Sequence, residues 1–179
     1  MSYRVCVFCG SRPGGSAAFV AAARALGAGV AKRGWTLVYG GGDVGLMGIS
    51  ADAALKAGGE VTGIIPQRLL EREVGKNDVT DLQVTATMFE RKERMIDGSD
   101  AFVVLPGGLG TLDELLEVMT LRQLGYHDKP IVLVDVDGYW QPCLRLFEAV
   151  VEGAFADASV LGLYAVAPDA GAALDLLGP

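Results

Sequence analysis

The chain has 179 residues, of which 51% are hydrophobic and 21% charged, a balance that excludes an intrinsically disordered protein and favours a globular one with a buried core. Its formal net charge of −7 argues against a nucleic-acid partner, because a protein that binds a duplex usually presents a basic face. No apolar stretch reaches the roughly 18 residues of a membrane span, and the first residues read as a strand rather than a signal peptide. We therefore expect a cytoplasmic protein with a small-molecule partner and with neither a nucleic-acid nor a membrane partner.

Strand-like segments alternate with helix-like segments along the chain. The apolar segments predict seven strands, at residues 3–9, 35–39, 60–65, 82–86, 101–105, 130–134 and 163–167. Helices are expected between them, at residues 16–33, 88–98, 110–124, 139–152 and 170–177, and from the glycine loop 40–48 to about residue 56. Residues 66–80 are polar and predict an irregular connection.

This alternation predicts βαβ units and therefore an α/β fold. We expect a single Rossmann-like domain over residues 1–179, with a mainly parallel sheet of about six to seven strands and helices on both faces. Ligands of such sheets bind at the carboxyl ends of the strands. Both glycine-rich loops, at residues 40–48 and 106–111, fall at that end.

The cysteines and the histidine give little support to redox or metal chemistry. Cys6, Cys9 and Cys143 are an odd number without the paired spacing of a zinc site, so we expect reduced thiols. Cys9 ends a strand, so two interpretations are open: a residue at the rim of a site, or a small residue that fills space. The second is favoured. His127 stands alone and is interpreted as a loop or interface residue. No metal or other cofactor is expected.

The first glycine-rich loop follows the second predicted strand. Gly40, Gly42 and Gly45 satisfy the G-x-G-x-x-G spacing of dinucleotide-binding loops. The match is weak, because that fingerprint follows the first strand and needs an acid at the end of the next, whereas Glu60 lies at the start of the third strand. The loop is therefore either a tight strand-to-helix turn or a nucleotide-contact loop that does not bind NAD. The contact residues in the second case are Gly10, Ser11, Gly41, Gly42 and Met47.

A charged segment, 87-TMFERKERM-95, predicts the start of a helix. Thr87 and Glu90 have the spacing of a capping box. Arg91, Lys92 and Arg94 follow within two turns, either as a solvated charged face or as cations that meet a phosphate at the carboxyl end of a strand.

The second glycine-rich loop, 106-PGGLGTLDE-114, runs from the fifth strand into a helix. Its glycines let the backbone approach an anion closely, and the helix N-terminus offers free N–H groups and the positive end of a dipole. Thr111 and Glu114 also have the spacing of a capping box, and Asp113 and Glu114 both suit the first turn of a helix. From these residues alone, Glu114 is more readily a cap than a catalytic group.

Together and in this order, the motifs resemble the Lonely Guy (LOG) family of cytokinin-activating phosphoribohydrolases. The family pattern P-G-G-x-G-T-x-x-E stands at residues 106–114, and its paired R-K at residues 91–92. Its glycine loop stands at residues 39–48, its entry strand at 7-VFCGSRPG-14, and the run 116–140 is also similar. These segments cover most of the chain, and the combination is highly specific although a lone PGGxGT is not.

The resemblance implies hydrolysis of the N-glycosidic bond of a nucleoside 5′-monophosphate, typically an N6-substituted adenosine 5′-monophosphate, with release of free base and ribose 5-phosphate. It also implies a Rossmann-like homodimer with each active site near the interface. Arg91 and Glu114 match the catalytic pair of the family. The positions that match its substrate-binding residues are Glu73, Lys92, Gly107, Gly108, Leu109, Gly110, Thr111, Leu112, Asp113 and Thr120.

Two departures leave the preferred base open: Phe89 stands where relatives often have His, and Leu109 where many have an aromatic residue. The chemistry itself is coherent, because cleavage of the bond builds positive charge on the ribose, which a fixed carboxylate stabilises. Arg91 would offset the phosphate charge or orient Glu114. The alternatives are a non-catalytic carrier or sensor of nucleotides or phosphate, a pyridoxal phosphate decarboxylase, and a nucleotide nucleosidase of broader range.

Overall fold

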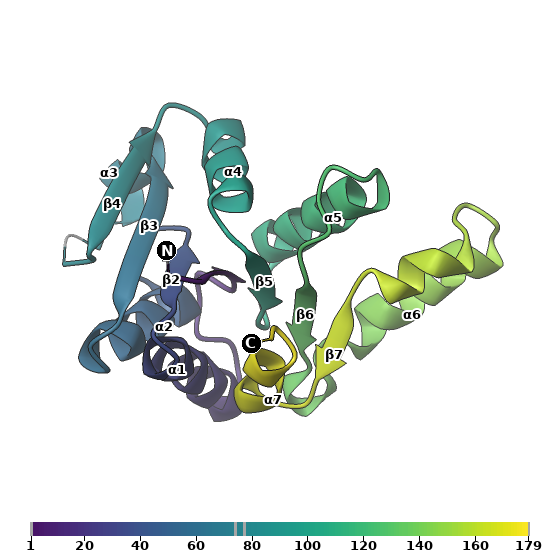
Figure 1. The fold of residues 1–179 in the computed structure, drawn as a ribbon, viewed down its shortest axis with the longest axis horizontal. Coiled ribbons are helices and arrows are strands. Elements are labelled where there is room, and N and C mark those ends of the chain that lie inside the picture. The colour runs from purple at the N-terminus through teal and green to yellow at the C-terminus, as the bar shows by residue number, and fades with distance from the viewer. Residues whose placement is uncertain (1, 74, 77, 179) are drawn as a thin grey trace.

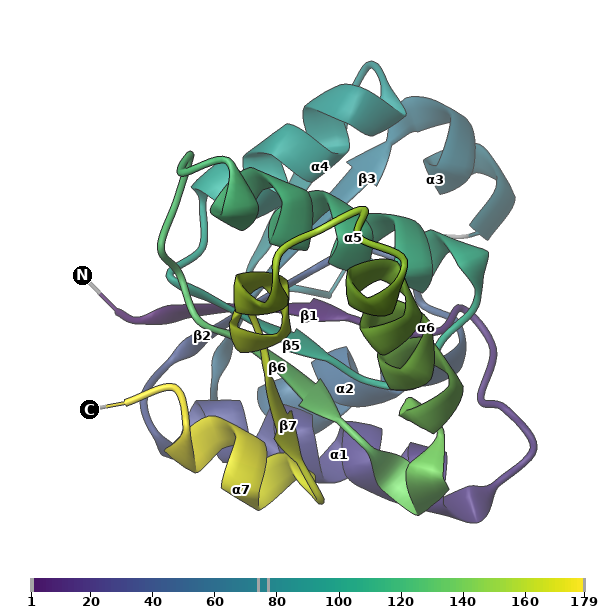
Figure 2. The same cartoon turned by 90° about the vertical axis from the view of Figure 1, so that its right-hand side faces the viewer.

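In the computed structural model, seven strands form one sheet with helices on both of its faces (Figures 1 and 2). The structure describes residues 2–73, 75–76 and 78–178, without the side chains of Arg72 and Glu73. The strand order is β4-β3-β2-β1-β5-β6-β7, and each strand is parallel to its neighbours. The predicted fold class is therefore confirmed.

The elements lie close to the predicted ranges. The strands are β1 (Arg4–Phe8), β2 (Thr36–Tyr39), β3 (Glu60–Pro66), β4 (Asp81–Thr85), β5 (Ala101–Val104), β6 (Ile131–Val134) and β7 (Ala165–Ala167). The helices are α1 (Ala17–Lys32), α2 (Gly45–Lys56), α3 (Gln67–Glu73), α4 (Met88–Asp97), α5 (Leu109–Gln123), α6 (Gln141–Glu152) and α7 (Ala170–Asp175). Two short 3-10 helices are η1 (Val136–Gly138) and η2 (Ala158–Gly162).

Helix α3 corrects the expectation of an irregular connection at residues 66–80. It has the sequence QRLLERE and spans 7 residues. A helix of this length completes about two turns, which is too short for an apolar period of 3.6 residues to become visible among charged neighbours.

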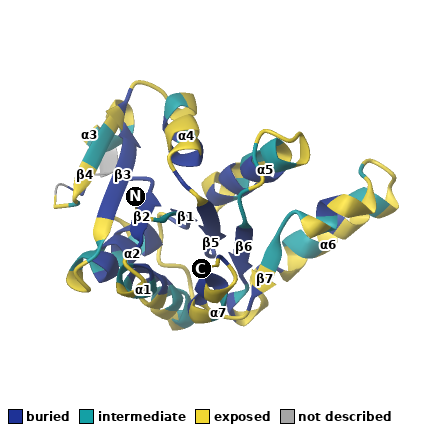
Figure 3. Ribbon diagram, in the orientation of Figure 1, coloured by how far each residue is buried: buried dark blue, intermediate teal, exposed yellow. Residues whose placement is uncertain are grey.

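Side chains of the central strands alternate between two cores, which fixes the layers on either side of the sheet. Val5 and Val7 of β1 point into a core shared with α1, α2 and α7. Cys6 and Phe8 point into a second core shared with α4, α5 and α6. Figure 3 shows these strands as a buried layer between the two sets of helices. Because both faces are covered, the strands read as continuous apolar runs in the sequence.

The carboxyl ends of β1 and β5 form the point where the chain changes direction across the sheet. The chain builds outward from β1 to β4 and then returns to β5 on the other side of β1. Open α/β sheets bind ligands in the crevice at such a switch point. The two loops that meet there are joined directly, because the Gly10 N–H donates to the Pro106 carbonyl at 3.1 Å.

Helices α1 and α2 pack closely enough to require a glycine between them. A Cβ atom at Gly27 would lie 2.0 Å from the Ser50 carbonyl oxygen of α2, which is backbone and has no rotamer to change. This contact sets how closely α2 approaches α1. Within the described residues, no helix combines the length and apolar character needed to cross a bilayer.

We expect Gly27→Ala to lower the free energy of unfolding by about 1–3 kcal/mol, because the new methyl group forces the two helices apart. The sign is informative, since Gly→Ala inside a helix otherwise stabilises by about 0.5–1 kcal/mol. Urea denaturation measures the difference. Gly29→Ala in the same helix is the control, because its Cβ would meet side-chain ends rather than backbone, Leu174 Cδ1 at 2.6 Å and Arg33 Nη1 at 3.6 Å, and a side-chain end can move. Equal effects of the two variants would contradict the role of Gly27.

Candidate active site

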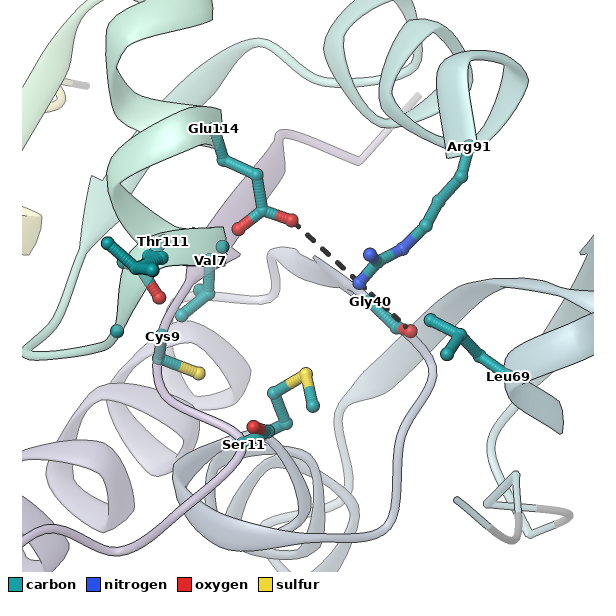
Figure 4. A pocket seen from close by; sticks show the side chains of 12 residues that line it. Val7, Cys9, Ser11, Gly40, Leu69, Arg91, Thr111 and Glu114 are labelled. Atoms are coloured by element: carbon teal, nitrogen blue, oxygen red, sulfur yellow. Dashed lines mark hydrogen bonds and ion pairs between the residues drawn. The ribbon is translucent and has the colours of Figure 1, made fainter. Parts of the chain in front are cut away.

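A cavity of about 230 Å³ lies at the carboxyl ends of β1 and β2, between side chains from α4 and α5 (Figure 4). It combines the charged pair Arg91–Glu114 with the glycine loop that precedes α5. Its walls are formed by Val7, Cys9, Ser11, Gly40, Met47, Leu69, Arg91, Gly108, Leu109, Gly110, Thr111 and Glu114.

Arg91 is held in place by the backbone ends of two strands. Its side chain is 9% exposed. The Nε–H donates to the Ile64 carbonyl at 3.1 Å, and Nη2 donates to the Gly40 carbonyl at 3.3 Å. A Cβ atom at Gly40 would lie 1.9 Å from Nη2, so the guanidinium group occupies space that only a glycine leaves free. Hydrogen bonds to the backbone of the sheet therefore fix the position of the Arg91 side chain.

Glu114 faces this guanidinium group from the first turns of α5 (Figure 4). Its Oε1 atom lies 3.8 Å from Arg91 Nη2, and its side chain is 11% exposed. Burial raises the pKa of Glu114 to about 7, while the charge of Arg91 acts in the opposite direction. A carboxyl group with this pKa changes its protonation state near neutral pH, which is unusual for a glutamate on a protein surface and typical of functional sites.

The start of α5 corrects the predicted capping box at Thr111 and Glu114. The helix begins at Leu109, its N-cap is Gly108, and no side chain caps it. Thr111 is therefore already inside the helix, and Glu114 does not lie at the capping position. In contrast, the capping box of α4 is confirmed: Thr87 Oγ1 accepts from the Glu90 N–H at 3.1 Å, and Glu90 Oε2 accepts from the Ala86 N–H at 2.8 Å.

The uncapped N-terminus of α5 leaves donors free at the cavity. Within the described part of the chain, no group accepts a hydrogen bond from the N–H groups of Gly108, Leu109, Gly110 or Thr111. Free N–H groups and the positive end of the helix dipole together favour an anion at this position. The arrangement places an anion-binding helix terminus and a buried carboxyl group in one cavity.

Lys92 lies beside the site but is already engaged by carboxylates. Its ammonium group is 3.0 Å from Asp113 and 2.9 Å from Glu117 of α5. Burial disfavours the charged form, but these hydrogen bonds outweigh it and raise the pKa of Lys92. The three residues join α4 to α5, and this contact supports the spacing between Arg91 and Glu114.

The first glycine loop serves mainly as a tight turn that packs against neighbouring backbone. Gly41 has φ of 75° and lies against Ile65 of β3, and Gly45 has φ of 57° and a Cβ position 2.3 Å from the carbonyl carbon of Ser11. Gly40 and Met47 line the cavity, whereas Gly41 and Gly42 are buried outside its wall.

The structure brings together part of the predicted site. The predicted residues that line the cavity are Ser11, Met47, Arg91, Gly108, Leu109, Gly110, Thr111 and Glu114. Gly10 and Gly107 line a neighbouring cavity instead, together with Ser11, Gly108 and Leu109. Leu112, Asp113 and Thr120 point elsewhere along α5, where Leu112 packs against the core and Thr120 is exposed. The side chain of Glu73 lies outside the described part of the chain.

Four wall residues were not predicted to contribute to the site. Val7 and Leu69 are apolar residues that carry no sequence signal, and Gly40 belongs to the G-x-G-x-x-G spacing but was not among the predicted contact residues of that loop. Cys9 lines the cavity, although the favoured interpretation of its sequence position was a residue that fills space. Burial raises the pKa of its thiol, and the charge of Glu114 raises it further. A thiol with a raised pKa is a poor nucleophile.

His127 was predicted to be a loop or interface residue, and it lies in the loop between α5 and β6. Its Nε2 atom lies 3.0 Å from the Val118 carbonyl oxygen, and its ring centroid is 5.5 Å from that of Phe102. Burial lowers its pKa, which keeps the imidazole neutral near neutral pH.

Comparison with known proteins adds an independent observation. Residues 47–177 match the family model described as "Possible lysine decarboxylase". The chain is 47% identical over 93% of its length to the "Probable cytokinin riboside 5'-monophosphate phosphoribohydrolase LOGL1" of Oryza sativa subsp. japonica, and it spans 75% of that protein. It is 44% identical over 93% of its length to the "Cytokinin riboside 5'-monophosphate phosphoribohydrolase LOG1" of Arabidopsis thaliana, of which it spans 78%.

Among solved structures, the Moco carrier protein of Chlamydomonas reinhardtii has the same fold. It superposes with a TM-score of 0.76 at 24% identity, over 98% of this chain and 95% of that one. At this identity the likeness concerns the fold alone.

We expect Glu114→Gln to stabilise the protein in a pH-dependent way. The folded state binds the Glu114 proton more tightly than the unfolded chain, so stability is lost as pH rises from the unfolded value of 4.5 through the folded value of about 7. Glutamine mimics the protonated form and avoids this loss. The variant should exceed the wild type by about 1–3 kcal/mol at about pH 8 and by less at about pH 5. Chemical denaturation at both pH values tests this. Glu148→Gln, at an exposed position of α6, controls for the loss of one negative charge, and a pH-independent difference for Glu114→Gln would contradict the assignment.

Proposed function

Because this chain belongs to the Lonely Guy (LOG) family of cytokinin riboside 5′-monophosphate phosphoribohydrolases, we propose that it hydrolyses the N-glycosidic bond of N6-substituted adenosine 5′-monophosphates. Its products are the free base, a cytokinin or adenine, and ribose 5-phosphate. The observation that carries this proposal is the buried Glu114 carboxyl group beside Arg91, in the cavity that also receives the free N-terminus of α5.

The N-terminus of α5 is the proposed site of the 5′-phosphate. The backbone N–H groups of Gly108 to Thr111 supply hydrogen-bond donors for it. Anchoring the phosphate there brings the ribose to the wall that carries Glu114, about one turn further along the helix. Fixing the substrate at its non-reacting end contributes to the rate by orienting the reacting carbon.

Glu114 is the proposed catalytic carboxylate and Arg91 its electrostatic partner. When the bond to the base breaks, positive charge develops on the ribose, and the ionised Glu114 stabilises it from a position that is largely shielded from bulk solvent. Water adds to C1′ as the base leaves, and the proton released by this water balances the proton that the departing base takes up. Arg91, fixed to the Ile64 and Gly40 carbonyls, maintains part of the ionised population of Glu114.

A carrier or sensor without catalytic activity fits these residues less well. A site that only binds phosphate gains nothing from a buried carboxyl group, because a carboxylate repels the anion and burial makes its charge costly. Glu114 has both properties in this cavity. The likeness to the Moco carrier protein concerns the fold and does not alter this reasoning.

A pyridoxal phosphate decarboxylase needs a lysine with a reactive amine, and the described cavity wall contains none. The two most buried ammonium groups near the site are engaged by carboxylates. Lys92 contacts Asp113 and Glu117, and Lys76 contacts Asp43, Asp52 and Asp78. These contacts raise the pKa of both lysines, the opposite of what Schiff-base chemistry needs.

The residues described so far bind the phosphate and act on the ribose, and they do not specify which base the enzyme prefers. Phe89 and Leu109, which depart from the residues common in the family, are 79% and 85% exposed. Leu109 lines the cavity, and Phe89 lies on α4 near Lys92, whose Nζ is 5.7 Å from the ring centroid. A panel of nucleoside 5′-monophosphates distinguishes an adenine-specific enzyme from a nucleosidase of broader range.

We expect the protein to release free base from isopentenyladenosine 5′-monophosphate or AMP without added metal, as measured by chromatography of the products.

Glu114→Gln should keep the fold and lose at least ~100-fold in kcat, because it removes the group that stabilises the transition state. Glu148→Gln is the matched control, since its side chain is exposed on α6 and does not line the cavity. No free base at high enzyme concentration would refute the reaction, and normal turnover by Glu114→Gln would refute the role of Glu114.

We further propose that the protein is a one-domain homodimer in the cytoplasm. Its three cysteines are free, as is typical of a reducing compartment. A dimer contact is supported by a hollow between α4 and α5 that is lined by Phe89, Leu121 and Tyr126. Phe89 and Tyr126 are 79% and 76% exposed, and exposed aromatic residues around a hollow are typical of protein interfaces. Because the hollow lies on the two helices that carry Arg91 and Glu114, a dimer through it would have its active sites near the interface.

We expect sedimentation to give twice the 18.7 kDa mass of the chain. Tyr126→Glu should shift the protein toward the monomer, because it buries a charge in the interface. Leu176→Glu is the control, since Leu176 is 54% exposed and follows α7 on the opposite face of the sheet. A monomeric wild type, or a dimer indifferent to Tyr126→Glu, would count against this surface.

A further inference from the structure

A second cavity, of about 610 Å³, lies on the other side of the glycine loop from the catalytic pocket. Gly107 and Tyr139 line it, and Ser11, Gly108 and Leu109 line both cavities. The glycine loop thus separates the two cavities, with the proposed phosphate position on one side and Tyr139 on the other. The Tyr139 hydroxyl donates a hydrogen bond to the Gly107 carbonyl across this second cavity.

Tyr139 is directed at the loop by the turn that follows β6. Asp137 and Gly138 adopt left-handed conformations, with φ of 53° and 72°. Asp135 accepts a hydrogen bond from the Trp140 N–H at 2.7 Å and so closes the turn around Tyr139. Asp137 also accepts from Ser16 Oγ at 3.0 Å, which ties the turn to the start of α1.

Aromatic neighbours hold the ring itself. The Tyr139 ring lies edge-on to Phe19, with centroids 5.5 Å apart, and edge-on to Trp140, with centroids 5.1 Å apart. Such pairs limit the motion of a ring beyond what its buried area provides. The hydroxyl is therefore presented to Gly107 by a preorganised side chain.

This hydrogen bond determines which way the neighbouring donor points. The peptide between Gly107 and Gly108 is trans, so its carbonyl and its N–H point in opposite directions. A carbonyl held toward Tyr139 turns the Gly108 N–H toward the catalytic pocket. Thr111 is the third residue of α5, so its N–H has no partner within the helix, and within the described chain it stays free.

Gly107 has little freedom to compensate for the loss of this bond. A Cβ atom there would lie 2.1 Å from Thr111 Oγ1, so the loop is packed tightly against the first turn of α5 on its other side. The peptide can rotate only by losing either this packing or the hydrogen bond to Tyr139.

We propose that Tyr139 is a positioning residue for the substrate phosphate: by holding the Gly107 carbonyl, it aims the N–H groups at the start of α5 at the anion. This inference rests on the proposed function, in which α5 binds the 5′-phosphate of a nucleotide. Tyr139 acts through the loop and does not touch the reacting atoms, so it affects binding of the phosphate rather than cleavage of the bond.

The test is Tyr139→Phe, which keeps the ring and removes only the hydroxyl. We expect KM for AMP and the Kd for ribose 5-phosphate to rise about 3- to 10-fold, the range of one neutral hydrogen bond. The value of kcat should stay within about twofold, and the Kd for adenosine, which lacks the phosphate, should not change. Steady-state kinetics and calorimetry measure these quantities. Tyr164→Phe is the control, because it removes a hydroxyl from a ring that packs against Phe147 of α6.

Two results would overturn the proposal. One is wild-type affinity of Tyr139→Phe for ribose 5-phosphate. The other is an equal loss of affinity for adenosine and ribose 5-phosphate, which would indicate general damage to the fold. Failure of the proposed function is a separate result: a wild type that binds ribose 5-phosphate and releases no base refutes the reaction, while the calorimetric comparison still tests Tyr139.

Discussion

The active site depends on one constraint, the capture of the Arg91 guanidinium group by the carbonyl oxygens of Ile64 and Gly40. Ile64 lies within β3 and Gly40 directly follows β2, so the cation is held by the backbone of the sheet rather than by a mobile side chain. Glu114 is buried within 3.8 Å of this fixed charge. Without the cation, a carboxyl group in this cavity would have an even higher pKa and a smaller ionised population.

The glycines of the site follow from the same close approach. Gly40 has no Cβ because the guanidinium group occupies that space, and Gly107 has none because Thr111 does. Neither position needs a glycine for backbone flexibility, since the described left-handed glycines lie elsewhere, as at Gly41 and Gly45. Two kinds of requirement, closeness to a side chain and an unusual φ, are thus mixed within motifs that look uniform in the sequence.

The site also shows how stability and function oppose each other. A carboxyl group with a pKa of about 7 destabilises the fold at the pH where its charge is useful, and the N-terminus of α5 is left without a side-chain cap. Both features lower stability and both contribute to the proposed reaction. Nearby contacts offset this loss of stability. Lys92 joins α4 to α5 through ion pairs with Asp113 and Glu117. The Lys76 ammonium group forms ion pairs with three aspartates, and its backbone N–H donates to the Gly41 carbonyl.

The sequence by itself determined the α/β class, the approximate range of each strand, and the family, because apolar periodicity and the order of local motifs are properties of short segments. It predicted the capping of α4 correctly for the same reason. It led to the wrong cap for α5, because a Thr-x-x-Glu spacing matched a capping box that the helix does not use. Only the tertiary structure decided that Glu114 is buried beside Arg91, that Gly40 makes room for that arginine, and that Tyr139 holds Gly107. Each of these depends on distances between residues that lie 23 to 51 positions apart in the chain, which are set by how the strands and helices pack and not by any local pattern.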